Sequence, residues 1–152
     1  MKVDTASDLD RAVRYQVYDH FARLGKAPLS SGIAAALGRD VADIRASLER
    51  LEQARAFALT PGTREVWMAH PFSAVPTPYP VEIDGRTYWA NCGWDALSIP
   101  LLLGRTGRVR TLCPDCNDRI DMTVTGEGVE PDEGVAHFVV PPRRFWDNVG
   151  FT

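Results

Sequence analysis

The chain has 152 residues, of which 45% are hydrophobic and 24% are charged, and its net charge at pH 7 is −3. This length suits one ordinary domain or two small ones, and the composition is typical of a globular protein. The acidic balance argues against nucleic-acid partners, because such binding relies on an excess of positive surface charge.

Targeting signals and the number of cysteines indicate where the protein is located and what its cysteines do. No run of about 18 apolar residues is present, so the sequence predicts no membrane span. The first residues, MKVDTASDLDR, lack the apolar segment of a signal peptide, and we therefore expect a cytoplasmic protein. Three cysteines are too few and of the wrong parity for a secreted disulfide framework, so metal or thiol chemistry is their expected role.

The first half of the chain shows helical periodicity. A first helix is expected to begin after Ser7, with Asp10 at the position of a capping box, and to end at Gly25. A short second helix is predicted over Ser30–Leu37, and a third starts near Asp40. The apolar residues that define the first and third helices are Val13, Val17, Phe21 and Leu24, and Val41, Ile44, Leu48 and Leu51.

A two-stranded hairpin is predicted after these helices, over 56–60 and 65–68, with the breaker Pro61-Gly62 between its strands. Three helices followed by a hairpin suggest a winged-helix-like unit over 1–70. Such a unit can bind DNA through its third helix, or it can serve only in packing or in covering a substrate. Acidic and basic residues alternate on the third helix, which is typical of a solvated face.

The second half of the chain is predicted to be richer in strands. Four prolines in 70–80 indicate an extended connection, which we place at 71–80. An Asp84-Gly85 turn joins predicted strands at 81–83 and 86–90, and a helix is expected from about Gly93 to Leu103. Further strands fit 108–112, 120–124 and 135–140. The sequence thus predicts an α+β fold, in which the winged-helix-like unit precedes a small mixed or antiparallel sheet over 81–152 with one helix packed on it.

Cys92 and Asp95 are the first candidates for chemistry. Cys92 lies where a strand is predicted to end and a helix to begin, and unpaired backbone N–H groups and the helix dipole favour an anion there. A cysteine in this position is expected to have a lowered pKa. Asp95 shares its helix face, so the pair would combine a soft thiolate with a proton carrier. A buried core cysteine beside a helix-start acid is the alternative interpretation.

Cys113 and Cys116 form a CxxC on a predicted turn between strands. One CxxC is half of a structural zinc site, and no second CxxC supplies the other half. Zinc at this pair, a soft-metal thiolate pair, a redox pair and two ordinary turn cysteines all stay open.

A resemblance to a known family enters with the stretch Tyr88 to Leu97 (YWANCGWDAL) and its continuation to Val109 (SIPLLLGRTGRV). A cysteine, two residues, an aspartate and an apolar helix ending in Gly-Arg-Thr resemble the core of the alkylmercury (organomercurial) lyases. The preceding helices, proline-rich connection and Asp-Gly hairpin are similar to the family's plan. The resemblance covers most of the chain, although only about 88–109 is specific.

The resemblance implies cleavage of a carbon–mercury bond by protonolysis, with a small organomercurial as substrate, Hg(II) as product and no cofactor for the chemistry. It assigns mercury binding to Cys92 and proton transfer to Asp95. The family also uses a second active-site cysteine in a downstream strand. The tail of this chain resembles the approach to that strand and carries no cysteine, so the family's C-terminal continuation is expected to be missing. Either the chain is a shortened relative or its second thiol comes from elsewhere, with Cys113 or Cys116 as the candidates.

Two other functions remain open on the sequence alone. The first is a non-catalytic thiol or metal-binding protein, such as a sensor or carrier of a soft metal ion on a lyase scaffold. The second is a transcriptional regulator that uses the winged-helix-like unit. In the lyase and carrier hypotheses the partners are an organomercurial or a soft metal ion, and the small-molecule or protein thiols that receive it.

Overall fold

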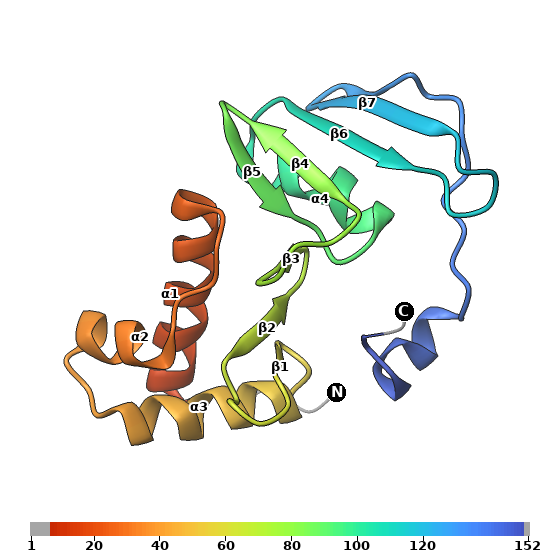
Figure 1. The fold of residues 1–152 in the computed structure, drawn as a ribbon. Helices are drawn as coiled ribbons and strands as arrows, with labels where there is room; N and C mark the ends of the chain where they lie inside the picture. Colours follow the sequence, from red (N-terminus) through yellow and green to blue (C-terminus); the bar gives the residue numbers. More distant parts are fainter. Residues whose placement is uncertain (1–6, 151–152) are drawn as a thin grey trace. The chain divides into compact units, whose positions relative to one another are not determined.

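The computed structural model describes residues 7–150, which form two compact units divided between Ala69 and His70 (Figure 1). The first unit is mainly helical and the second is built on an antiparallel sheet, so the predicted α+β class is confirmed. None of the helices in the described part of the chain is long and apolar enough to cross a membrane.

Three helices and a hairpin make up the first unit: α1 (Asp8–Leu24), α2 (Ser30–Leu37), α3 (Val41–Gln53), β1 (Ala58–Leu59) and β2 (Val66–Ala69). The Ser7 hydroxyl accepts the Asp10 N–H at 3.1 Å at the start of α1. Gly25 ends the helix in the left-handed conformation, as its sequence position predicts. The resemblance to winged-helix proteins remains an interpretation.

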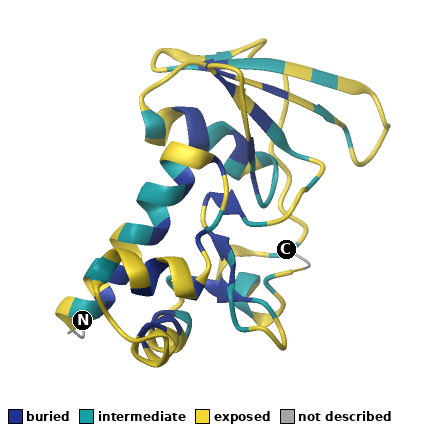
Figure 2. Cartoon of the chain, turned by 60° about the vertical axis from the view of Figure 1, so that its left-hand side comes forward, coloured by how far each residue is buried: buried dark blue, intermediate teal, exposed yellow. Residues whose placement is uncertain are grey.

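The core of the first unit is formed by the inner faces of its helices (Figure 2). Most of the predicted apolar stripe is buried, but Leu24 and Val41 are exposed, because each lies at the end of its helix. Asp10 is also buried and accepts hydrogen bonds from Ser47 at 2.5 Å and Arg50 at 2.6 Å. Chiefly the Arg50 hydrogen bond lowers the pKa of Asp10 to about 2, so this carboxylate stays ionised and ties α1 to α3.

Two arginine side chains of α3, which a DNA-binding interpretation would place against phosphates, are paired with carboxylates. Glu65 accepts hydrogen bonds from the backbone and hydroxyl of Ser30 at 2.7 and 2.6 Å, at the start of α2. Arg45 lies 3.9 Å from the same carboxylate, and Arg50 is paired with Asp10. Two arginines of α3 are therefore neutralised within the unit itself, which gives no support to phosphate binding.

The second unit is a five-stranded sheet in the order β5-β4-β6-β7-β8, with every neighbouring pair antiparallel. Its elements are β3 (Phe72–Ser73), β4 (Pro80–Ile83), β5 (Arg86–Trp89), α4 (Gly93–Leu103), β6 (Gly107–Leu112), β7 (Arg119–Thr125), β8 (Gly128–Glu130) and the 3₁₀ helix η1 (Pro142–Asp147). Positive φ angles at Asp84 and Gly85 form the tight turn between β4 and β5.

Helix α4 covers one face of this sheet and packs against β4, β6 and β7 (Figure 1). Its bounds are those that the sequence predicts, with Gly104 in the left-handed conformation after the last residue. Gly107 allows the close approach, because a Cβ there would overlap the Pro100 ring and crowd Ile83. The packing of α4 fixes its first turn, which carries Cys92 and Asp95, relative to the sheet.

The segment 71–80, predicted to be an extended connection, contains the two-residue strand β3. Two predictions about the strands need correction. The strand predicted at 135–140 is wrong: this segment has no strand structure, and Val135 and Val139 are 93% and 78% exposed. Alternating valines favour a strand only where a neighbouring strand can pair with them, and none does so here. The strand next to β7 is instead the polar β8, which the sequence analysis missed.

Candidate active site

Cys92 caps the N-terminus of α4. The chain leaves β5 at Trp89, and Ala90 forms an antiparallel bridge with Phe72 of β3. Cys92 then has an extended backbone, and its carbonyl accepts the Ala96 N–H at 3.0 Å as the helix begins. The predicted position at a strand end and helix start is therefore what the structure has.

The Asp95 side chain and the backbone N–H groups of Asp95 and Trp94 lie close enough to the Cys92 sulfur to shift its pKa, although no side-chain hydrogen bond caps α4 at Cys92. The side chain of Asp95 is only 15% exposed. The two residues singled out in the sequence thus lie near each other, at the cap and in the first turn of one helix.

The expected lowering of the Cys92 pKa is wrong. Burial of the half-buried thiol raises its pKa above the ordinary value, and the negative charge of Asp95 raises it further. The N–H groups of Asp95 and Trp94 act in the opposite direction and do not outweigh these effects. Cys92 is therefore a protonated thiol at neutral pH, with a carboxylate beside it.

Two residues that the sequence analysis did not assign to this site hold Asp95 in place. Nδ1 of His70 lies 3.3 Å from Asp95 Oδ2, and the Asn91 amide donates to the same oxygen at 3.2 Å. Asn91 also donates to the Phe72 carbonyl at 3.2 Å, which ties this cluster to β3. Asn91 precedes Asp95 by four residues, a spacing that could have indicated the contact, whereas nothing local indicated His70.

Asn91 has a second feature that distinguishes it. Its side-chain oxygen is buried and, within residues 7–150, has no hydrogen-bond partner. Buried polar atoms are paired in the great majority of cases, so an unpaired acceptor one residue from Cys92 marks this end of α4 as unusual.

Aromatic side chains from the end of the chain surround the same cluster. Trp94, which is 55% exposed, contacts Phe138 with ring centroids 6.1 Å apart, and Phe138 contacts Phe145 at 5.6 Å. Trp146 contacts the His70 ring edge-on at 5.9 Å. Phe138 and the helix η1 therefore supply aromatic rings that contact Trp94 and His70, next to Cys92 and Asp95.

Cys113 and Cys116 lie on the turn between β6 and β7, as the sequence predicts. The Cys113 N–H donates to the Asp118 carbonyl at 2.8 Å, and the Asn117 N–H donates to the Cys113 carbonyl at 2.9 Å. The Cys116 thiol donates to the Asp118 carboxylate at 3.3 Å. The pair is thus fixed on a tight, hydrogen-bonded turn.

The residues that the structure describes contain no group of three or more His, Cys, Asp or Glu side chains placed to hold a metal ion. Zinc at Cys113 and Cys116 is accordingly not supported, because a structural zinc site needs four ligands. By the same observation, Cys92, Cys113 and Cys116 do not form a three-ligand group among the described residues.

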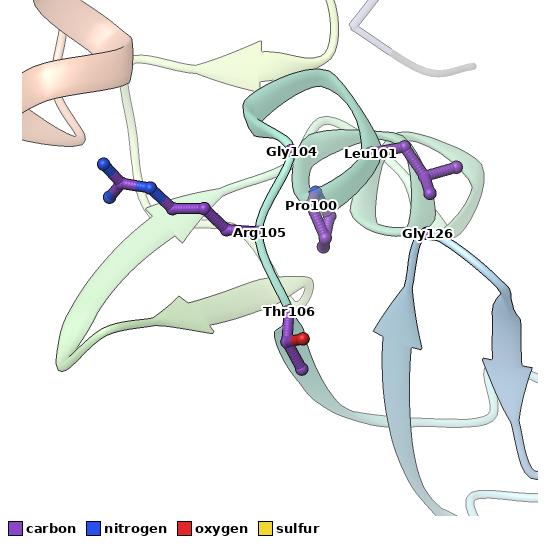
Figure 3. A pocket seen from close by; sticks show the side chains of 6 residues that line it. All are labelled: Pro100, Leu101, Gly104, Arg105, Thr106 and Gly126. Atoms are coloured by element: carbon purple, nitrogen blue, oxygen red, sulfur yellow. The ribbon is translucent and has the colours of Figure 1, made fainter.

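A small pocket of about 190 Å³ lies at the other end of α4 (Figure 3). It is lined by Pro100, Leu101, Gly104, Arg105, Thr106 and Gly126. An 11-residue helix is roughly 16 Å long, so this pocket is far from Cys92 at the opposite end. Its lining includes neither a thiol nor a carboxylate, and we do not assign the chemistry to it.

Comparisons with known proteins agree with the resemblance read from the sequence. The family model of alkylmercury lyase (MerB) matches residues 72–152. The alkylmercury lyase of Staphylococcus epidermidis is 31% identical over 134 residues, which cover 78% of this chain and 57% of that protein. The alkylmercury lyase of Pseudomonas putida is 37% identical over 68 residues, covering 43% of this chain and 32% of that protein.

A solved structure supports the fold. The mercury-bound form of MerB2 aligns with a TM-score of 0.61 and 19% identity, over 86% of this chain and 62% of that one. The chain spans 57% of the length of the Staphylococcus epidermidis protein and 32% of the length of the Pseudomonas putida protein. The family match includes β3, α4 and the Cys92–Asp95 pair, and on this evidence the chain belongs to the alkylmercury lyase family.

Proposed function

We propose that this chain binds an organomercury compound through the Cys92 sulfur and cleaves its carbon–mercury bond by protonolysis, with Asp95 carrying the proton. The observation that carries the proposal is the placement of the Cys92 thiol and the Asp95 carboxyl at the start of α4, close enough for Asp95 to shift the pKa of Cys92. Membership of the alkylmercury lyase family supports it.

The first step is capture of mercury. Mercury is a soft ion that prefers sulfur ligands, so the Cys92 sulfur displaces a weaker ligand X from R–Hg–X. The raised pKa means that the thiol still carries its proton when the substrate arrives, and the adjacent Asp95 carboxylate accepts this proton as the S–Hg bond forms. The products of the step are Cys92–S–Hg–R, a protonated Asp95 and X⁻.

The second step breaks the carbon–mercury bond. A second thiolate, R′S⁻, adds to mercury and increases the electron density on the attached carbon. The electron pair of the C–Hg bond then takes the proton from Asp95, which gives R–H, Cys92–S–Hg–SR′ and the Asp95 carboxylate. Mercury remains Hg(II) throughout, so the reaction as written needs no redox cofactor, and Hg(II) leaves by exchange with further thiols.

His70 and Asn91 act as positioning residues in this scheme. Both contact Oδ2 of Asp95, at 3.3 and 3.2 Å, and we therefore assign the transferred proton to Oδ1. Fixing the carboxyl in one orientation keeps its proton within reach of the carbon attached to mercury. The exposed rings of Trp94 and Phe138 provide an apolar surface for the organic group R.

Hydrocarbon release tests the proposal. The chain is incubated with phenylmercury and an excess of a small thiol, and benzene is measured by gas chromatography. We expect catalytic release that Cys92→Ser and Asp95→Ala both abolish. A matched control is Asp132→Asn, which removes an exposed carboxylate of the same unit and should leave release unchanged.

The opposite result would also be informative. If no benzene forms while mercury remains bound through Cys92, the lyase proposal is wrong and a thiol-based binding protein on a lyase scaffold takes its place. No observation on the described residues favours a transcriptional regulator.

A further inference from the structure

We infer that Cys113 and Cys116 form a second thiol site, which binds Hg(II) as a chelate of two sulfurs within one chain. The pair lies on the β6–β7 turn, away from the first turn of α4, and the reaction proposed for Cys92 does not use it. Its role as acceptor of the Hg(II) released at Cys92 rests on the proposed function, whereas the binding site itself does not.

The turn holds the two sulfurs together before any ion binds. Backbone hydrogen bonds from Cys113 to Asp118 and from Asn117 to Cys113 close the turn at 2.8 and 2.9 Å. The N–H groups of Cys116 and Asp115 and the Cys116 thiol lie close enough to the Cys113 sulfur to shift its pKa, while the Cys116 thiol donates to Asp118. A pair fixed in this way loses little conformational freedom when it chelates an ion.

The number of available metal-binding side chains indicates which ion the pair can bind. Within residues 7–150 the pair is not part of a group of three or more metal-binding side chains. Zinc requires four ligands in a structural site, whereas Hg(II) forms stable linear complexes with two thiolates. A two-sulfur site on a tight turn thus suits a soft, two-coordinate ion.

The topology of the sheet places this turn and Cys92 at the same end of the strands. β5 and β6 flank β4 and both run antiparallel to it, so they run parallel to each other. Trp89, at the end of β5, pairs with Pro80, and Val109 of β6 pairs with the adjacent Val81. The carboxyl ends of β5 and β6, which lead to Cys92 and Cys113, therefore lie at the same end of the sheet (Figure 1).

Transfer between the two sites would be an exchange of thiolates. The bonds from Hg(II) to Cys92 and to its second thiolate break, and bonds to the sulfurs of Cys113 and Cys116 form. The Cys113 and Cys116 protons pass to the two sulfurs that leave. Mercury is neither oxidised nor reduced.

Mercury binding in a Cys92→Ser background tests the inference, because this background has no lyase activity under the proposed function. The reduced full chain is titrated with mercuric chloride without oxygen, and the ultraviolet sulfur-to-mercury absorption is followed during competition with glutathione. Cys92→Ser with Cys113→Ser and Cys92→Ser with Cys116→Ser are the matched controls. Serine is nearly isosteric at these turn positions, and circular dichroism checks that the variants fold.

We expect one Hg(II) per monomer in the Cys92→Ser chain. Stripping it should need at least a hundredfold more glutathione than stripping either control, because the second sulfur binds intramolecularly. Equal sensitivity of all three proteins to glutathione would overturn the inference, as would dimers bridged by mercury. Neither result depends on hydrocarbon release, so failure of the chelate and failure of the lyase proposal are distinguishable.

Discussion

Cys92 and Cys113 have similar backbone surroundings and opposite thiol chemistry. Each follows a strand of the same sheet, and two nearby backbone N–H groups lower the pKa of each sulfur. The pKa of Cys92 is nevertheless raised and the pKa of Cys113 is lowered. The difference lies in what else surrounds the sulfur: burial and the Asp95 carboxylate at Cys92, and an exposed turn with a second thiol at Cys113.

This comparison teaches that N–H groups at a helix start or a turn do not by themselves produce a thiolate. Burial penalises the charged form, and a neighbouring carboxylate penalises it again. A thiol that keeps its proton beside a carboxylate suits a reaction that must deliver a proton to carbon. A thiol of lowered pKa on a turn, with a second thiol beside it, suits the binding of an ion.

The largest expected effect comes from removing the Asp95 carboxylate beside Cys92. Asp95→Asn should lower hydrocarbon release by about 10²–10⁴-fold, the range expected for loss of a general acid–base group. Mercury capture by Cys92 should persist, and the pKa of Cys92 should fall because a negative charge that raises it is gone. Gas chromatography and pH-dependent ultraviolet thiolate absorbance, in a Cys113→Ser, Cys116→Ser background, measure the two effects. Unchanged release would contradict the role of Asp95.

Alkylation tests the comparison directly. At neutral pH, iodoacetamide should modify Cys113 at least tenfold faster than Cys92, as followed by peptide mass spectrometry. Only the thiolate reacts, so both rates rise with pH. The rise for Cys113 should be complete at a lower pH than the rise for Cys92, because their pKa values are shifted in opposite directions. Faster modification of Cys92 at neutral pH would reverse the comparison.

The residues that hold Asp95 should have an intermediate effect. His70→Phe removes one contact to Oδ2, and we expect kcat for hydrocarbon release to fall about tenfold, or ~1.4 kcal/mol, with KM unchanged. His70→Gln, which retains a side-chain N–H donor, should recover most of the loss. A fall in stability without this kcat and KM pattern would instead indicate a purely structural role.

The smallest effect is expected from a substitution in the turn that carries Cys113 and Cys116. Cys116→Ala removes one of three hydrogen bonds to the Cys113 sulfur and leaves the two backbone donors, from Cys116 itself and Asp115. The pKa of Cys113 should rise slightly, and its alkylation rate at neutral pH should fall about two- to threefold, within the scale of one weak hydrogen bond. A larger fall would show that the paired thiol, rather than the turn backbone, controls Cys113. The alkylation rate of Cys92 serves as the internal control.

Much of the second unit could be predicted from local sequence. The bounds of α4, the Asp84-Gly85 turn and the turn that carries the CxxC depend on neighbouring residues along the chain, through caps, positive φ angles and short hydrogen bonds. The contact between Cys92 and Asp95 follows from their spacing on one helical turn. The strand at 135–140 could not be judged in this way, because a strand needs a partner that local pattern does not specify.

The sequence by itself determined the helix that begins at Cys92, the carboxylate one turn along it and the pairing of Cys113 with Cys116, because each is a matter of spacing within a few residues. Only the tertiary structure decided that Cys92 keeps its proton, because burial is a property of the packed chain. It also decided that His70 reaches Asp95: the bridge between Phe72 and Ala90 joins segments 18 residues apart and sets these side chains side by side.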